Sequence, residues 1–207
     1  MIGAATMRFY LRLWLAFAIT LGLASPVQAG DNEKLYHLIN PPVALQGEAP
    51  EVVEVFNFHC PHCNDFYPVL EKWAHGYQGK LNVHSLPVYW GSQPDTPVRA
   101  YFAAEYLGVG EKMKRAIFAA NFDDNRYKID EEQDILKIAS EAGIDAKKLE
   151  EAMDSFAVFG KVAQVNSLAR QYGIQGTPSV VVNGRYRVVA HGDYGDVVKT
   201  IESLLQK

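Results

Sequence analysis

Cysteine is scarce in this sequence: among 207 residues there are only two, Cys60 and Cys63, separated by Pro61 and His62. Small proteins that rely on disulfides for stability carry many more cysteines. Closing so short a loop restrains the unfolded chain by only about 2 kcal/mol, against about 5 kcal/mol for a loop of about 100 residues. An idle structural bridge is therefore a weak explanation of the pair, and the fold must draw its stability from a hydrophobic core.

The pattern around the cysteines also lacks the spacing of a metal or haem site. Residues 59–63 supply imidazole and thiol groups, but residues so close together rarely converge on one tetrahedral metal, and no second Cys/His pair at zinc-finger spacing follows. A c-type haem would need a histidine directly after Cys63, where Asn64 stands. No nucleotide-binding motif is present. We expect redox chemistry without a metal or an organic cofactor, with a metal site and an idle bridge as the alternatives.

Positive charge is not in excess. The chain has 20 Lys and Arg against 24 Asp and Glu, a formal net charge of −4. A mildly acidic surface repels the phosphate backbone, so we expect no nucleic-acid partner.

Long apolar runs are confined to the N-terminus. Arg8 and Arg12 precede an apolar stretch over 13–23, which is too short for a bilayer core that needs about 20 residues. Val27 and Ala29 then place small residues at the cleavage positions. This layout is typical of a secretory signal peptide, so we predict that residues 1–29 are cleaved; an uncleaved anchor helix is the alternative.

The residues around the cysteine pair predict where it lies in the fold. Residues 52–58 are β-branched and aromatic, which indicates a buried strand. After Cys60, apolar residues recur at helical spacing, and Pro61 stands at the favoured first-turn position. The N-terminus of a helix stabilises a thiolate. We therefore predict Cys60 as the exposed nucleophile and Cys63, about one turn further on, as its buried resolving partner.

The two residues between the cysteines are expected to adjust the reactivity of the pair. Pro61 stiffens the turn, and His62 offers a hydrogen bond or a positive charge to the Cys60 thiolate. Both effects favour the reduced form and so make the disulfide a stronger oxidant.

Further along the chain, apolar periodicity predicts an alternation of strands and helices that is interrupted once. The expected elements before the interruption are a strand at 35–39, the strand at 52–58, a helix from 61 to about 76 and a strand at 81–90. Five helical segments follow, at 96–106, 111–121, 131–142, 146–156 and about 158–172. Thr96 is expected to cap the first of these helices, and Asp130 the third, with Gln133 completing a capping box. A strand at 179–183, a hairpin turn at Asn183-Gly184, a strand at 185–190 and a helix at 194–205 complete the chain.

Five consecutive helices do not fit an alternating α/β sheet. We therefore predict an α/β domain formed by residues 30–92 and 173–207, and an inserted all-helical subdomain over 93–172.

The strand, the Cys-Pro-His-Cys motif and a helix broken by Pro68 resemble the DsbA family of periplasmic thiol:disulfide oxidoreductases. Residues 176–184, Gly-Thr-Pro-Ser-Val-Val-Val-Asn-Gly, resemble the family's second signature, a cis-proline loop that leads into a strand and a hairpin. The resemblance covers nearly all of the predicted mature chain. It implies a thioredoxin-like fold with the helical insertion described above.

The resemblance also implies how a substrate is held. The Thr177–Pro178 peptide bond would be cis, which would bring the backbone of Thr177 beside Cys60. That backbone could then pair with an extended substrate peptide by strand addition.

The activity that the resemblance implies is that of a periplasmic protein dithiol oxidase. It would donate the Cys60–Cys63 disulfide to cysteine pairs of newly exported proteins, and a DsbB-type quinone-linked membrane oxidase would reoxidise it. The protein is expected to be monomeric. A thiol reductase or thiol-protecting protein on the same scaffold, and a non-catalytic peptide-binding module, are the alternatives.

Glu54 interrupts the apolar strand six residues before Cys60, where a buried carboxylate is costly unless it is paired or protonated. The resemblance implies that Glu54 lies beneath the cysteines as a proton acceptor or relay for Cys63; a register that exposes it to solvent is the alternative. Some family members pair this acid with a lysine on the neighbouring strand. Here the strand at 81–90 has no lysine, and only His84 on it can titrate.

Two positions depart from the family pattern. His59 stands where an aromatic residue is common, and Thr177 stands where the best-known oxidases carry an aliphatic residue. We expect these differences to lower the oxidising power without changing the chemistry.

Overall fold

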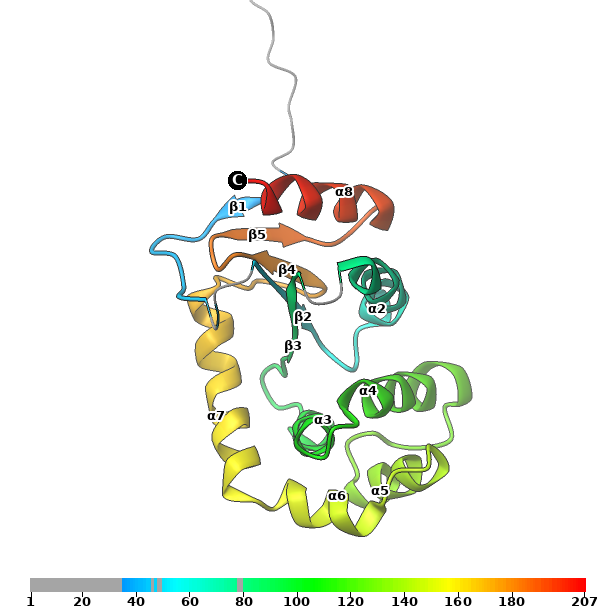
Figure 1. Cartoon of the computed structure of the whole chain (residues 1–207). Coiled ribbons are helices and arrows are strands. Elements are labelled where there is room, and N and C mark those ends of the chain that lie inside the picture. Colours follow the sequence, from blue (N-terminus) through cyan, green and yellow to red (C-terminus); the bar gives the residue numbers. More distant parts are fainter. Residues whose placement is uncertain (1–34, 46, 48–49, 78–79) are drawn as a thin grey trace, which may run out of the picture. The chain divides into compact units, whose positions relative to one another are not determined.

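The computed structural model describes residues 35–45, 47, 50–77 and 80–207; the predicted signal peptide and its cleavage site lie outside the described residues. A five-stranded mixed sheet forms the centre of the fold, with strand order β1-β5-β4-β2-β3 (Figure 1). Its strands are β1 (His37–Leu38), β2 (Glu51–Phe56), β3 (Asn82–Pro87), β4 (Ser179–Val182) and β5 (Tyr186–Val189). β2 runs parallel to β3, and the other neighbours pair antiparallel.

β2 is the central strand of the site, and all six of its residues are buried. The reason is that each face of the sheet is covered. On one face, α2 (Pro61–Ala74) and α8 (Tyr194–Leu205) pack Phe66, Leu70 and Ile201 against the sheet. The opposite face carries a larger cluster that continues into the remaining helices.

Five helices stand between β3 and β4 in the described chain. They are α3 (Thr96–Tyr106), α4 (Gly110–Ala119), α5 (Glu132–Glu141), α6 (Ala146–Met153) and α7 (Phe156–Gln171). A π-helical turn, η2 (Ala120–Asp124), extends α4, and a short 3-10 helix, η1 (His75–Tyr77), follows α2. Figure 1 shows α7 running from this group of helices back to the sheet. Within the described residues, no helix is both long enough and apolar enough to cross a membrane.

The elements lie where the sequence predicts, with corrected ends. β1 has only two residues because only His37 and Leu38 pair with β5. α2 continues through Pro68 and is not broken there. The hairpin forms at Asn183-Gly184, where both residues have positive φ, and a Cβ on Gly184 would lie 2.1 Å from the Val43 carbonyl oxygen.

Two predicted helix caps are wrong. Thr96 is the first residue of α3 and not its cap, which is Asp95. The N-cap residue of α5 is Glu131, not Asp130. Neither Asp95 nor Glu131 makes a side-chain hydrogen bond that caps its helix. The carboxylate of Asp130 contacts His59 instead, so a long-range interaction has replaced the local one that the sequence suggests.

Candidate active site

The cysteine pair lies where β2 passes into α2. Cys60 is the N-cap residue of α2 and is half-buried, whereas Cys63 lies in the first turn and is fully buried. The Cys60 carbonyl accepts hydrogen bonds from the backbone N–H groups of Cys63 (3.1 Å) and Asn64 (3.3 Å). The arrangement leaves the Cys60 sulfur at the positive end of the helix, which favours its thiolate.

The two thiols titrate very differently. A hydrogen bond from the Cys63 side chain lowers the pKa of Cys60 to about 6, helped by Thr177 and by backbone bonds with Cys63 and His62, although burial acts in the opposite direction. Burial raises the pKa of the Cys63 thiol well above its ordinary value, and the hydrogen bond to Cys60 adds to this effect. The first proton lost by the pair therefore leaves Cys60.

The loop before β4 meets Cys60 from the other end of the chain. The Thr177–Pro178 peptide bond is cis, as the resemblance implies. The Cys60 thiol donates to the Thr177 carbonyl oxygen over 3.4 Å. The Ser179 hydroxyl donates to the Gly176 carbonyl at 2.7 Å and fastens this loop to itself.

His62 and Pro61 occupy the exposed first turn of α2. The carbonyl of His62 accepts a hydrogen bond from the Tyr194 hydroxyl at 3.1 Å. The Tyr194 ring also packs on Phe66, with ring centroids 5.1 Å apart. α8 therefore braces the turn that carries His62.

Glu54 is buried, with 3% of its surface exposed, so the exposed alternative is wrong. Its partner is Lys114 of α4, a residue that sequence reasoning missed. The Ser85 hydroxyl donates to Glu54 Oε2 at 3.2 Å and accepts from Lys114 Nζ at 3.1 Å. The Lys114 ammonium also lies 4.6 Å from the centre of the Phe56 ring.

His84, the one titratable group expected near Glu54, lies on the other face of the sheet. β2 and β3 pair Glu54 with Ser85 and Val53 with His84, and successive side chains of a strand point to opposite faces. His84 Nε2 is 3.7 Å from a carboxylate oxygen of Glu51 instead.

The Glu54–Lys114 pair lines a cavity of about 390 Å³ between α2, β3 and α4. Burial disfavours the charged form of Lys114, but the carboxylates of Glu54 and Glu111 outweigh it and raise the pKa of the lysine. Burial raises the pKa of Glu111, which lines the same cavity. Lys114 is thus held as a cation beside Glu54.

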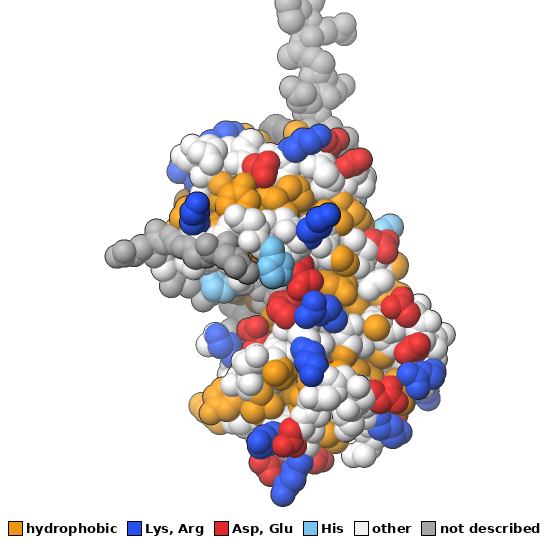
Figure 2. Space-filling view, turned by 45° about the vertical axis from the view of Figure 1, so that its right-hand side comes forward, with side chains coloured by type: hydrophobic (Ala, Val, Ile, Leu, Met, Phe, Trp, Pro, Cys, Tyr) orange, Lys and Arg blue, Asp and Glu red, His pale blue; other side chains and the backbone are white. Residues whose placement is uncertain are grey.

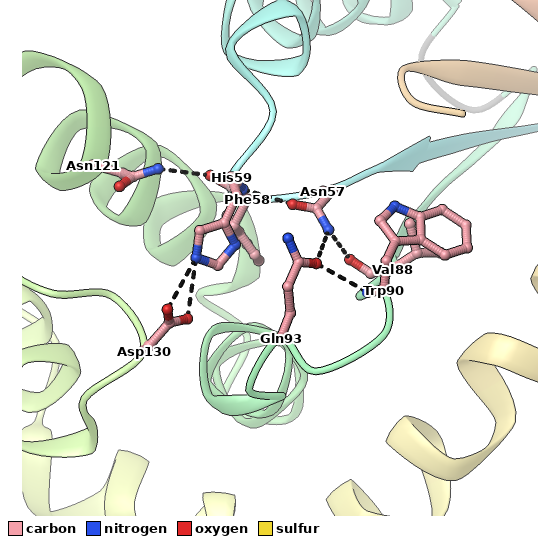
Figure 3. Close-up of polar contacts among 8 residues, drawn as sticks. All are labelled: Asn57, Phe58, His59, Val88, Trp90, Gln93, Asn121 and Asp130. Atoms are coloured by element: carbon pink, nitrogen blue, oxygen red, sulfur yellow. Dashed lines mark hydrogen bonds and ion pairs between the residues drawn. The ribbon is translucent and has the colours of Figure 1, made fainter. Parts of the chain in front are cut away.

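A polar network fixes the turn between β2 and Cys60 (Figure 3). The buried side chain of Asn57 donates to the Val88 carbonyl and to Gln93 Oε1, both at 2.9 Å. Its oxygen accepts the N–H of His59 at 2.7 Å, and its backbone carbonyl accepts the N–H of Cys60 at 3.0 Å. The signal in the sequence is a lone amide within the apolar run 52–58, whose composition predicts a strand over all seven residues.

Residues from the helices complete this network. Asn121 Nδ2, in η2, donates to the Phe58 carbonyl at 3.1 Å. Both carboxylate oxygens of Asp130 lie 3.1 to 3.2 Å from His59 Nε2. Neither Asn121 nor Asp130 was identified from the sequence as part of the site.

The surface around these elements carries mixed charge. On the face shown in Figure 2, acidic and basic side chains are interspersed. Among the described residues, no group of three or more His, Cys, Asp or Glu side chains could hold a metal ion.

Comparison with known proteins gives consistent matches. A family model of the DSBA-like thioredoxin domain matches residues 70–205. The thiol:disulfide interchange protein DsbA of Burkholderia cepacia is 32% identical over 178 residues, which cover 86% of this chain and 84% of that protein. DsbA of Haemophilus influenzae is 34% identical over 166 residues, which cover 76% of this chain and 80% of that protein.

The fold agrees with solved structures as well. The crystal structure of Pseudomonas aeruginosa DsbA superimposes with a TM-score of 0.78 at 26% identity, covering 84% of this chain and 92% of that chain. The thioredoxin-like fold class predicted from the sequence is confirmed by these matches.

Proposed function

This chain belongs to the DsbA family of thiol:disulfide oxidoreductases, and from that premise we propose that it is an exported dithiol oxidase that donates the Cys60–Cys63 disulfide to other proteins. The observation that carries the proposal is the asymmetry of the pair. Cys60 is half-buried at the start of α2 with its pKa lowered to about 6, whereas Cys63 is buried and stays protonated. A stabilised Cys60 thiolate favours the reduced enzyme, which makes its disulfide a good oxidant.

The reaction proceeds in two exchanges. A substrate thiolate attacks Cys60 Sγ, the Cys60–Cys63 bond breaks, and Cys63 leaves and takes up a proton. The second substrate thiolate then attacks the substrate sulfur of the mixed disulfide, and Cys60 leaves as a thiolate. The substrate loses two electrons and gains a disulfide, and the enzyme gains the two electrons as a dithiol.

The remaining residues have supporting roles in this proposal. Pro61 stiffens the turn, and His62 stabilises the Cys60 thiolate from the exposed side. The backbone of Thr177, set by Pro178, pairs with the extended substrate peptide by strand addition. Substrate choice then rests largely on main-chain contacts, which suits an enzyme with many client proteins.

Glu54 acts as a proton acceptor or relay for Cys63. A buried carboxylate needs a charge partner, and the ion pair with Lys114 supplies it. The cavity that both residues line offers space for the water through which a proton would travel.

The family and the N-terminal sequence support the proposed location and partners. Residues 1–29 direct export to the periplasm and are removed there. The substrates are exported proteins with reduced cysteines, and a DsbB-type quinone-linked membrane oxidase restores the disulfide. The protein works as a monomer, and the helices over 93–172 form a subdomain inserted into the thioredoxin-like domain.

The test is the redox equilibrium of Cys60–Cys63 against a glutathione buffer, read by quenched alkylation, together with reactivation of a reduced, unfolded disulfide protein. We expect a potential well above that of thioredoxin and loss of reactivation in Cys60→Ser. A thioredoxin-like potential with little reactivation would favour the reductase. Function retained when both cysteines are serine would favour the peptide-binding module.

A further inference from the structure

The backbone of the turn before Cys60 is fixed without help from the His59 ring. Asn57 accepts the N–H groups of His59 and Cys60, and Asn121 donates to the Phe58 carbonyl. The imidazole of His59 is therefore not needed to hold the backbone of this turn. Where the ring points is a separate matter, decided by its own contacts.

Within the described part of the chain, the polar contact of that ring is with Asp130. Nε2 lies 3.1 Å from Oδ1 and 3.2 Å from Oδ2. A neutral imidazole that carries its proton on Nε2 donates a hydrogen bond to the carboxylate, and a protonated imidazole forms an ion pair with it. The contact therefore holds in both charge states of His59.

Asp130 is a firm anchor because its own segment is fastened elsewhere. The adjoining side chain of Ile129 is buried, with 2% of its surface exposed. The N–H of Glu131 donates to the Lys128 carbonyl at 2.9 Å, which closes the turn before α5. Figure 3 shows the His59 ring directed toward Asp130 and away from α2, the helix that Cys60 caps.

We propose that Asp130 is a positioning residue for thiol-disulfide exchange at Cys60, since it holds the His59 ring on the side of the turn remote from the reacting sulfur. An unheld ring would sample the other staggered positions about its Cα–Cβ bond. It would then compete with an incoming peptide for the space beside Cys60. The inference rests on the proposed function, because it concerns the rate of the same exchange.

His59 and Asp130 are both partly exposed, so the contact between them can be tested by substitution. The side chains of His59 and Asp130 are 29% and 39% exposed, so their replacement leaves no buried charge unpaired. Glu151 provides the control, since it is an exposed carboxylate of the same group of helices that pairs with Lys147 on its own helix, α6.

The first measurement is the second-order rate at which the oxidised full-length mature protein oxidises a peptide with two cysteines. We expect Asp130→Ala to slow this reaction about fivefold, the scale of one partly exposed charged contact. Asp130→Asn, whose amide can still bond the ring, should stay within about twofold of the wild type, and Glu151→Ala should match the wild type. His59→Ala and the double variant His59→Ala with Asp130→Ala should both react at nearly the wild-type rate, because neither has a ring to release.

Rescue in the double variant is the outcome that a merely structural role of Asp130 would not produce. A double variant as slow as Asp130→Ala, or an Asp130→Ala variant as fast as the wild type, would overturn the proposal. Asp130→Ser replaces Asp130→Ala if the latter lowers the melting temperature.

A second measurement does not depend on the oxidase activity. The reduced protein is alkylated at Cys60 with small iodoacetamide and with a bulky peptide maleimide. We expect Asp130→Ala to slow the bulky reagent selectively, and the additional His59→Ala change to reverse the effect. If the ratio of the two alkylation rates is the same in every variant, the positioning role is rejected. A wild type that fails to oxidise the peptide would reject only the proposed function.

Discussion

Lys114 of α4 pairs with Glu54 of β2 across 60 residues of sequence, and both side chains are almost fully buried. The pair joins β2, an interior strand of the sheet, to the helices that follow β3. Ser85 bonds to both members and sets them side by side.

Replacement of Lys114 by methionine should destabilise the protein by about 3 to 5 kcal/mol, because it leaves a buried carboxylate without its cation. Chemical denaturation measures the loss. Changing Glu54→Gln in the same protein should recover part of it, since the unpaired charge is then gone. The control is Lys112→Met on the same helix, which removes an exposed lysine that donates to the Gly143 carbonyl. A loss of stability in Lys112→Met as large as that in Lys114→Met would contradict the role given to the buried pair.

The alkylation rate of reduced Cys60 should rise with pH and level off above a midpoint of about pH 6, because the thiolate is the reactive form. Below the midpoint the rate should fall about tenfold per pH unit. The midpoints of Cys63→Ser and Cys63→Ala measure how much the Cys63 thiol lowers the pKa of Cys60. The serine hydroxyl can still donate a hydrogen bond, whereas alanine cannot. We expect Cys63→Ala to move the midpoint upward, toward the ordinary cysteine value, because the hydrogen bond from the Cys63 thiol is the largest cause of the lowered pKa of Cys60. An unchanged midpoint would show that the Cys63 thiol does not lower the pKa of Cys60.

The reduced protein should gain stability relative to the oxidised protein as the pH rises from about 6 to 9. The pKa of Cys60 is about 6 in the folded state and 9.0 in the unfolded state, so the unfolded chain binds more protons in this window. The gain is fully present near pH 9 and is lost as the pH falls through 6, whereas above pH 9 the raised pKa of Cys63 in the folded state acts in the opposite direction. Urea unfolding of both redox forms at several pH values measures it, with Cys60→Ser as the control that should show no such slope.

Asn57→Ala should cost about 1 to 3 kcal/mol of stability, because it leaves the buried carbonyl of Val88 and the N–H of His59 without their partner. We also expect slower exchange at Cys60, since the turn that aims this residue is built on Asn57. Stability and peptide oxidation are compared with Gln171→Ala, in which an exposed amide is removed. Wild-type stability in Asn57→Ala would show that the network contributes little.

Local patterns predicted much of the fold, since periodicity and turn residues report on short-range structure. The last helix at 194–205, the hairpin at Asn183-Gly184 and the strand-to-helix junction at Cys60 are confirmed. The cis bond at Thr177–Pro178 was predicted only through the family resemblance, because a proline before a strand does not by itself imply it.

The long-range contacts of the site could not be predicted in this way. Lys114 looks like any helical lysine in the sequence, and only the packing of α4 on the sheet brings it to Glu54. The position of Asp130 in the sequence predicts a helix cap, because a nearby acceptor is the usual partner of a helix N-terminus. Its contact with His59 spans 71 residues, a separation on which local periodicity carries no information.

The strand order also determines at which stage of folding the active site forms. β2 can pair with β3 soon after both are made, but its other neighbour is β4, where Val52 faces Val182. The contact between Cys60 and Thr177 likewise spans 117 residues. A chain that is synthesised from its N-terminus must therefore deliver nearly its whole length before Cys60 meets Thr177. Until then the two cysteines belong to an unfinished sheet, so the protein becomes an oxidant of other chains only once its own folding is almost complete.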